Sequence, residues 1–444
     1  MNITKDPIHG LILKIAIPSS IGFFFHTMYN VVDTYFAGLH STDALAALAI
    51  SFPVFFIIIS IGYGISQGIT VLLSNALGAN QLKEAKNIFV QSISYTFFVS
   101  LFLTPVGIAL APHLFEFLGA KEQYLDLSLS YMNVLFLGTV SFMAAYCLNA
   151  ALNSMGDTKS FRNMLIITFL MNCALNPIFM FGFGFIPAMG LKGIALSTVV
   201  TEGLGAIYLL HRVRKTELWC EITFKKLVPN FSCYKDISAQ GLPASFTMMT
   251  VAIGIFIITW YISQFGKVGV AAYGIATRIE QIALLLTIGL NSAVLTISGQ
   301  NYGAKLYHRI REVWLHCLKI GFVIMFASGI ILYFSNHWLM SLFTTDGDVV
   351  REGGIYLSIA SFALFAYTVL FSTNSMLQGI KRPMFGVWLG ISRQIILPVL
   401  VFHFLSFTLG WGLIGIWWGV FFIVWIAAVF SFMYGLRKLK LLST

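Results

Sequence analysis

Apolar segments of about 20 residues or more recur along the whole 444-residue chain, and they restrict the folds open to it. A helix of about that length spans the roughly 30 Å of hydrocarbon in a bilayer. Hydrophobic residues make up 58% of the chain and charged residues 10%, far from the balance of a soluble domain. The segments lack the alternating pattern of membrane β-strands. The sequence therefore predicts an all-α integral membrane protein.

Twelve of these segments are expected to cross the membrane as helices. Lys and Arg gather at alternate ends of the segments, as they do on the cytoplasmic side of membrane proteins, so both termini are expected in the cytoplasm. The net charge of +10 follows from the same bias and needs no nucleic acid partner. The expected helices cover residues 11–37, 45–75, 88–110, 125–153, 163–183, 190–211, 237–265, 270–300, 314–335, 352–378, 385–408 and 412–435.

The two halves of the chain read as copies of each other. An offset of 225 residues relates Pro18 to Pro243 and Gly64 to Gly289. Each copy holds an even number of helices, so both enter and leave on the same side, as in the parallel repeats of secondary transporters. We therefore expect two pseudo-symmetric six-helix lobes around a central cleft. The predicted domains are an N-lobe at 1–211, a cytoplasmic linker at 212–236 and a C-lobe at 237–444.

A carboxyl group inside the first segment gives the strongest indication of function. A charge at the membrane centre costs about 2.5–3.5 kcal/mol on insertion scales, so Asp33 is expected to face a polar cavity. His26 and Asn30 precede it at helical spacing and share its face. Pro18 is expected to bend the same helix. The alternative is an Asp that caps the helix or only fixes packing.

The energy for transport is expected to come from an ion gradient, because the chain has no Walker A sequence for ATP. Asp33 has no cation in its own helix, so it is a candidate for reversible protonation or for binding Na⁺, a hard cation that prefers oxygen ligands. Asn172 and Asn176 are one helical turn apart and complete the predicted Na⁺ site. Interhelical hydrogen bonding is the other interpretation of this pair. No cofactor is expected.

Four more ionisable residues lie inside predicted helices and are candidates for cleft or gating roles. Glu202 in the sixth helix is a candidate second protonatable group. Arg278 and Glu280 in the eighth are two residues apart, so they are expected to point to different faces, and Arg393 lies in the eleventh. A membrane enzyme is disfavoured because no HExxH or nucleophile elbow is present. The five cysteines lack CxxC spacing, so neither a disulfide framework nor a zinc site is expected.

Several motifs, taken together, resemble the multidrug and toxic compound extrusion (MATE) family over nearly the whole chain. They are SNALGA at 74–79, NSMGDTKS at 153–160, GLKGIALSTVVTEG at 190–203, ATRIE at 276–280, GQNYGA at 299–304 and LQGIKRP at 377–383. The resemblance implies twelve helices in two lobes around a cleft. It also implies export of organic cations and amphiphilic drugs in exchange for Na⁺ or H⁺.

The resemblance further implies a cation site in the N-lobe and a bend of the first helix at Pro18. The implied ion-binding residues are Asp33, Tyr131, Asn172, Asn176 and Thr198. Other branches carry acidic residues in the seventh and tenth helices, and their absence here favours the N-lobe site and a DinF-like member. Asn176 stands where some relatives have a second Asp, which favours H⁺ over Na⁺.

The combined prediction is a monomeric antiporter of a bacterial inner membrane that exports drugs in exchange for H⁺ or Na⁺. Its expected partners are small-molecule substrates and membrane lipid. A flippase for a lipid-linked saccharide is the alternative. More cationic residues than Arg278 and Arg393 would then be expected in the cleft to meet pyrophosphate.

Overall fold

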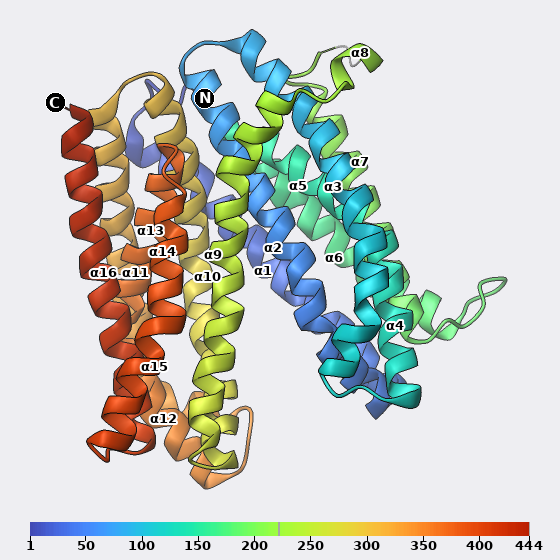
Figure 1. The fold of residues 1–444 in the computed structure, drawn as a ribbon, viewed down its shortest axis with the longest axis vertical. Coiled ribbons are helices and arrows are strands. Elements are labelled where there is room, and N and C mark those ends of the chain that lie inside the picture. The colour runs from blue at the N-terminus through green and yellow to red at the C-terminus, as the bar shows by residue number, and fades with distance from the viewer. Residues whose placement is uncertain (221–222, 444) are drawn as a thin grey trace. The chain divides into compact units, whose positions relative to one another are not determined.

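The computed structural model describes residues 1–220 and 223–443, and in this part of the chain the regular structure is helical except for one isolated bridge, Phe183 to Ile186 (Figure 1). The predicted all-α class is confirmed. The elements are α1 (Ile8–His40), α2 (Thr42–Gly78), α3 (Leu82–Phe117), α4 (Glu122–Leu137), α5 (Thr139–Ser154), α6 (Thr158–Phe181), α7 (Leu191–Val213), α8 (Phe224–Leu227), α9 (Phe231–Ser263), α10 (Lys267–Gly303), α11 (Tyr307–Ser341), α12 (Gly347–Ser361), α13 (Leu364–Gly379), α14 (Met384–Ile391), the π-helical η1 (Ser392–Ile396), α15 (Leu397–Phe402), the π-helical η2 (His403–Thr408) and α16 (Leu413–Ser443).

Ten spans of the described chain are long and apolar enough to cross a membrane, and two bent helix pairs raise the number to twelve. The pair α4 and α5 bends by 46°, and the pair α12 and α13 bends by 53°. The predicted helices at 125–153 and 352–378 are therefore each broken. At the first break, a Cβ on Gly138 would lie 2.2 Å from a methyl of Val199, so glycine allows this bend to approach α7.

The chain folds into two compact units. Unit 1 comprises Met1–Ser20 and Phe246–Thr444, and unit 2 comprises Ile21–Ser245. Helices α1 and α9 therefore each belong to both units, and they change unit after Ser20 and Ser245, two serines that are themselves one repeat offset apart. The lobe and linker boundaries derived from the sequence repeat stay a prediction. Positions 221–222 of that linker lie outside the described residues.

Backbone conformation repeats with the same offset as the sequence. Asn80 and Lys305 follow α2 and α10 with left-handed φ values of 58° and 61°. Gly156 and Lys381, the next pair at this offset, have φ values of 79° and 59°. Residues with a side chain rarely adopt this conformation. Its recurrence shows that the two halves share local structure as well as sequence.

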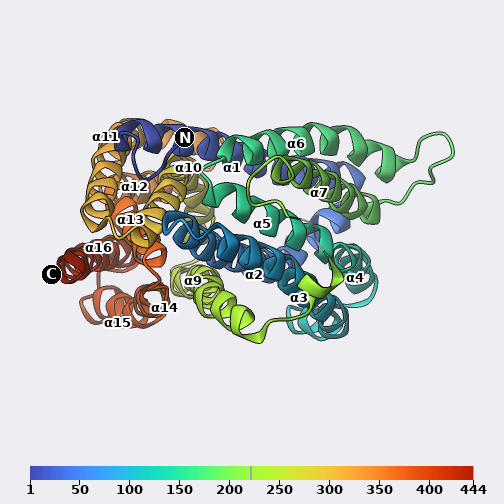
Figure 2. The same cartoon turned by 90° about the horizontal axis from the view of Figure 1, so that it is seen from above.

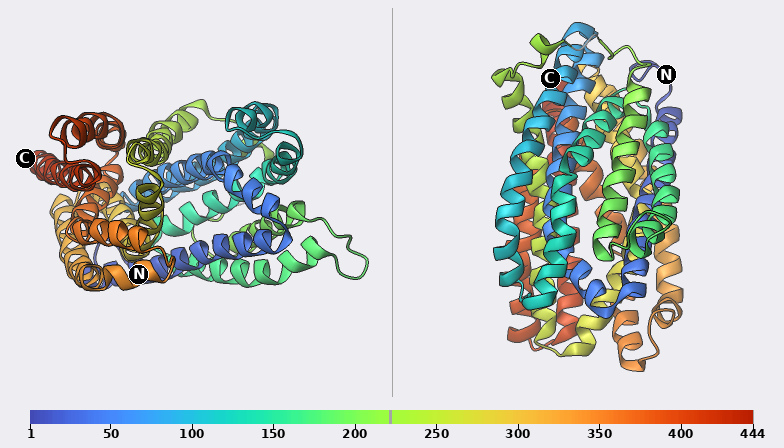
Figure 3. Two further views of the ribbon diagram at one scale, coloured as in Figure 1. Left: turned by 90° about the horizontal axis from the view of Figure 1, so that it is seen from below. Right: turned by 90° about the vertical axis from the view of Figure 1, so that its right-hand side faces the viewer.

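Apolar burial anchors the start of α1 in unit 1. Leu11, Ile12 and Ile15 are fully or almost fully buried in a cluster that includes Trp314 of α11. The start of the chain and the end of α16 lie at the same end of this unit (Figure 3). The core of unit 2 is a separate cluster that includes Phe89 of α3. The two ends of α1 are therefore held by different cores.

Glycine allows both shared helices to pack closely within a unit. A Cβ on Gly64 of α2 would lie 2.4 Å from the backbone nitrogen of Ser245 in α9. A Cβ on Gly289 of α10 would lie 2.1 Å from the carbonyl oxygen of Ala16 in α1. Real Cβ atoms do not approach backbone this closely, so both positions require glycine. The same kind of close helix contact therefore occurs at equivalent repeat positions in both units.

The described part of the linker is held against α3 of unit 2. Gln91 of α3 is 3% exposed, and its Nε2 donates to the carbonyl oxygens of Lys226 and Val228 at 2.8 and 3.0 Å. Its Oε1 accepts from the N–H of Asn230 at 2.9 Å. One buried side chain therefore satisfies three backbone groups of the segment that leads into α9.

We expect Gly289→Ala to destabilise the protein because its new methyl group would collide with the backbone of α1. Overpacking of this kind costs about 1–3 kcal/mol. Gly274→Ala in the same helix is the matched control, since nothing lies within 4 Å of its Cβ position. Thermal unfolding of the purified variants measures the difference. An equal midpoint for Gly289→Ala and the parent would contradict the close approach.

Candidate ion-binding site

Asp33 lies in the part of α1 that belongs to unit 2 and is 6% exposed. Its Oδ1 accepts hydrogen bonds from Nδ2 of Asn176 at 2.8 Å and of Asn172 at 3.0 Å. Its Oδ2 accepts from Oγ1 of Thr198 at 3.2 Å. Hydrogen bonds to a charged acceptor are about twice as strong as those between neutral groups. Three donors from α6 and α7 thus stabilise one carboxylate on α1.

The two asparagines also bind each other. Nδ2 of Asn176 donates to Oδ1 of Asn172 at 3.1 Å, and Nδ2 of Asn172 lies 3.3 Å from Oδ1 of Asn176. Both side chains are completely buried. Asn172 additionally reaches Oγ of Ser197 on α7 at 3.4 Å. The structure therefore combines the two interpretations of this pair: the amides join helices, and they do so at Asp33.

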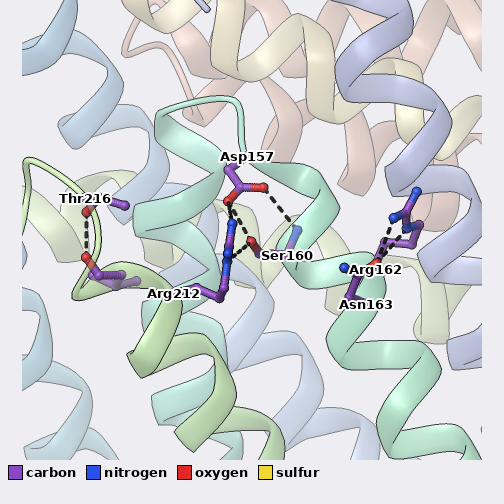
Figure 4. Close-up of polar contacts among 7 residues, drawn as sticks. Asp157, Ser160, Arg162, Asn163, Arg212 and Thr216 are labelled. Atoms are coloured by element: carbon purple, nitrogen blue, oxygen red, sulfur yellow. Dashed lines mark hydrogen bonds and ion pairs between the residues drawn. The ribbon is translucent and has the colours of Figure 1, made fainter.

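A polar cluster joins the ends of α6 and α7, the helices that carry the donors (Figure 4). Asp157 caps α6 by accepting from the N–H of Ser160 at 3.1 Å and from its hydroxyl at 2.6 Å. Arg212 in the last turn of α7 donates to Oγ of Ser160 at 2.9 Å and lies 3.6 Å from the Asp157 carboxylate. The two helices run side by side (Figure 2). Part of the NSMGDTKS motif therefore fixes the donor helices to each other.

Tyr29 and Thr201 extend the site and were not among the residues predicted. The Tyr29 hydroxyl lies 2.6 Å from Oγ1 of Thr201, and both side chains are buried. Tyr29 precedes Asp33 by one helical turn, and Thr201 follows Thr198 by nearly one turn, so helical spacing was the available signal. Tyr131 is buried close enough to Asp33 for the charge to act on its phenol. No hydrogen bond joins these two among the described residues.

Four of the predicted residues stay apart from this hydrogen-bonded cluster. His26 is half-buried and Asn30 is exposed, and Nδ2 of Asn30 donates to the carbonyl oxygen of His26 at 3.0 Å. Glu202 is half-buried beside Thr201, without an ion pair or a side-chain hydrogen bond to the described chain. Pro18 lies inside α1, two residues before Ser20, where the helix changes unit.

The remaining predicted residues lie in unit 1 and do not contribute to the Asp33 site. Arg278 is exposed and Glu280 is 5% exposed, so the two point to different faces of α10, as their spacing indicates. Arg393 lies in η1 with its guanidinium over the ring of Tyr367. Unit 1 thus has ionisable groups of its own.

Ten to twelve candidate spans in the described chain, with a buried, hydrogen-bonded carboxylate in unit 2, define a multi-pass membrane protein. The family model described as MatE matches residues 18–178 and 243–402, which is most of the chain, so the protein belongs to the MatE family. The predicted family is confirmed, and it consists of transporters of small molecules rather than enzymes. The DinF-like branch stays a prediction.

Named relatives and solved structures match over most of the chain. The FAD transporter of Shewanella oneidensis is 27% identical over 395 residues, which is 88% of this chain and 86% of that protein. The multidrug export protein MepA of Staphylococcus aureus is 24% identical over 418 residues, which is 94% and 91% of the two chains. A MOP superfamily transporter from Pyrococcus furiosus has the same fold, with a TM-score of 0.92, 24% identity and coverage of 100% and 98%.

Removing the donors of Asp33 should destabilise the protein in proportion to the bond lost. Asn176→Leu removes the 2.8 Å donor, and losing a hydrogen bond to a charged group costs about 1.5–3 kcal/mol. Thr198→Val keeps the shape and removes only the 3.2 Å bond, so its cost should be smaller. Chemical unfolding of the purified variants gives both values. A larger loss for Thr198→Val would contradict this order.

Proposed function

We propose that the protein is a secondary antiporter that exports organic cations or amphiphilic drugs in exchange for H⁺ or Na⁺, with Asp33 as the coupling residue. The observation that carries the proposal is the buried carboxyl group of Asp33, which joins α1 to α6 and α7 through three hydrogen bonds. Similarity to a multidrug export protein supports the substrate class. Similarity to an FAD transporter supports organic anions as a second class.

Ion binding at Asp33 acts on the position of α1. A proton on this carboxyl group removes its charge, so the bonds from the asparagines and Thr198 weaken to those of a neutral acceptor. Because these hydrogen bonds join α1 to α6 and α7, the three helices are then held together less tightly. Helix α1 belongs to both compact units and carries Pro18 beside the residue where it changes unit. We expect α1 to bend there and the substrate to be displaced.

The exchange requires that ion and substrate prefer different conformations. A ligand shifts a conformational equilibrium only by its difference in affinity for the two states. A proton or Na⁺ taken up from outside favours the state in which α1 is released from its donors. The substrate favours the state in which Asp33 is ionised and bound by them. Ion and substrate thereby compete through α1.

The donor arrangement favours H⁺ as the coupling ion. Both asparagine amides direct N–H groups at Asp33, which suits an ionised carboxylate by itself. Na⁺ prefers oxygen ligands, and the site would supply them from Asp33, Thr198 and the amide oxygens after each amide turned over. The cluster contains one carboxylate, because Asn176 is neutral. A proton needs nothing beyond that carboxylate.

We also propose that the antiporter works as a monomer in a bacterial inner membrane, with both termini in the cytoplasm, and that it belongs to the DinF-like branch. The alternating distribution of Lys and Arg along the sequence supports this orientation. The start of the chain and the end of α16 lie at one end of unit 1, which agrees with an even number of membrane crossings (Figure 3).

Ethidium transport in proteoliposomes, driven by a pH gradient or a Na⁺ gradient applied separately, tests this function. We expect one gradient to drive transport by the parent, and that gradient identifies the ion. Asp33→Asn should reduce the driven rate at least tenfold because the side chain keeps its shape but loses its charge. Asp43→Asn is the matched control, since Asp43 is exposed in the first turn of α2.

Two results would contradict the proposal. If neither gradient drives transport of ethidium by the folded parent, the antiporter function is wrong for this substrate class. If Asp33→Asn transports ethidium as fast as the parent, coupling does not depend on Asp33. Light scattering of each purified variant confirms that a lost rate is not caused by aggregation.

A further inference from the structure

A buried carboxyl group other than Asp33 lies in the described part of unit 1, and a tyrosine donates a hydrogen bond to it. Glu280 lies near the middle of α10 and is 5% exposed. Its Oε2 accepts a hydrogen bond from the hydroxyl of Tyr356 on α12 at 2.7 Å. A polar pair at this depth in a membrane span normally has a function.

Aromatic packing fixes the tyrosine of this pair. The ring of Tyr356 meets Tyr273 edge-on, with 5.6 Å between centroids, and meets Trp417 in the same way at 5.1 Å. Tyr273 stacks on Trp417 at 6.0 Å. Rings from α10, α12 and α16 thus hold the hydroxyl at Glu280. Edge-to-face pairs of this kind contribute about 0.5–1.5 kcal/mol each beyond burial.

A guanidinium group lies beside the pair. Arg393 is half-buried in η1, and its Cζ lies 5.7 Å from the ring centroid of Tyr367. Its charge acts on Glu280, yet no nitrogen–oxygen pair between them comes within 4.0 Å. Among the described residues no carboxylate oxygen lies within 4.0 Å of its nitrogens, and its flat group lies over the ring of Tyr367. Most of the five N–H donors of this permanent cation are therefore available to another acceptor.

The backbone at Arg393 also differs from an ordinary helix. Residues Ser392–Ile396 form a π-helical turn between α14 and α15. Turns of this kind interrupt α-helices rarely and often occur at functional sites. The arginine thus lies at a local departure from regular α-helix near the middle of the candidate span Met384–Thr408.

The sequence repeat relates this cluster to the Asp33 site. Tyr131 and Tyr356 are 225 residues apart, the offset of the repeat, and each lies near a buried carboxyl group. Asn172 and Arg393 each stand five residues before a proline of the same span. The carboxyl groups come from different helices, α1 in unit 2 and α10 in unit 1. Unit 1 therefore contains a counterpart of the Asp33 site.

The two sites differ in one chemical respect. Where unit 2 presents the neutral amide of Asn172, unit 1 presents the guanidinium of Arg393. The counterpart site thus already contains a fixed cation, so Na⁺ is not required there to balance the charge of Glu280. Arginine binds carboxylate and phosphate groups with two parallel hydrogen bonds, which suits an anionic ligand.

We propose that Arg393 binds the anionic group of an aromatic organic anion and that Glu280 is the internal anion this group replaces. The neighbouring ring of Tyr367, which is only partly buried, provides aromatic surface for such a molecule. That the bound anion is exported rests on the proposed function. Binding itself is independent of Asp33 and is measured separately.

Opposite effects of two substitutions distinguish this role from a structural one. Arg393→Gln removes the cation that attracts the anion, so binding weakens. Glu280→Gln removes the competing internal anion while its amide oxygen still accepts from Tyr356, so binding tightens. Damage to packing alone would weaken binding in both variants.

Fluorescein, a planar aromatic anion, is the probe, and its anisotropy is titrated with the purified full-length protein in detergent. We expect Arg393→Gln to raise Kd at least tenfold and Glu280→Gln to lower it severalfold. Arg393→Lys keeps the charge but loses the two-pronged geometry, so its Kd should be intermediate. The control is Arg351→Gln, because the Arg351 side chain is 63% exposed in an ion pair on α12.

Three results would overturn the inference: no binding of fluorescein to the parent, unchanged binding by Arg393→Gln, or weaker binding by Glu280→Gln. If Arg393→Gln does not fold, Arg393→Lys takes its place in the test. Fluorescein binding by Arg393→Lys that equals the parent's, together with weaker binding by Glu280→Gln, also overturns the inference. Gradient-driven ethidium transport is measured on the same preparations. If it persists while fluorescein binding fails the test, this inference is wrong and the proposed function stands.

Discussion

The hydrogen bonds of Asp33 are the constraint on which the rest of unit 2 depends. A bilayer supplies no water to a buried carboxylate, so the protein itself must provide its partners. These partners come from α6 and α7, which are fixed to each other at one end by Asp157 and Arg212. Any change in the charge of Asp33 therefore changes the strength of the hydrogen bonds between α1 and two helices that are already joined.

Duplication determines which unit each part of α1 and α9 belongs to. Each unit is built mainly from one half of the sequence but includes the first part of the opening helix of the other half. Gly64 and Gly289 make the close approach of these borrowed segments possible, because any side chain would collide with backbone. The segments before Ser20 in α1 and before Ser245 in α9 are thus held in a different core from the remainder of their helices.

The sequence predicted the features that depend on local spacing and composition. Twelve apolar segments, the rarity of Asp33 and the one-turn spacing of Asn172 and Asn176 are visible without long-range information. Other features depend on contacts between distant residues and were therefore missed. The membership of α1 in both units is one, and the pairing of Tyr29 with Thr201 is another. Helical spacing predicts that Asn30 shares a face with Asp33, yet its amide donates to a carbonyl oxygen of its own helix.

The difference between the two halves follows from how each site balances its charge. A buried carboxylate needs either several donors or a nearby cation, since desolvation of an unpaired charge is costly. Asp33 has neutral donors, so in the proposed antiporter its charge is cancelled by an ion that arrives from outside. Glu280 has a tyrosine donor and the permanent charge of Arg393 nearby. A duplicated framework can in this way support two kinds of site: a carboxyl group with neutral donors, where we propose that a cation binds, and a carboxyl group that already has a fixed cation beside it.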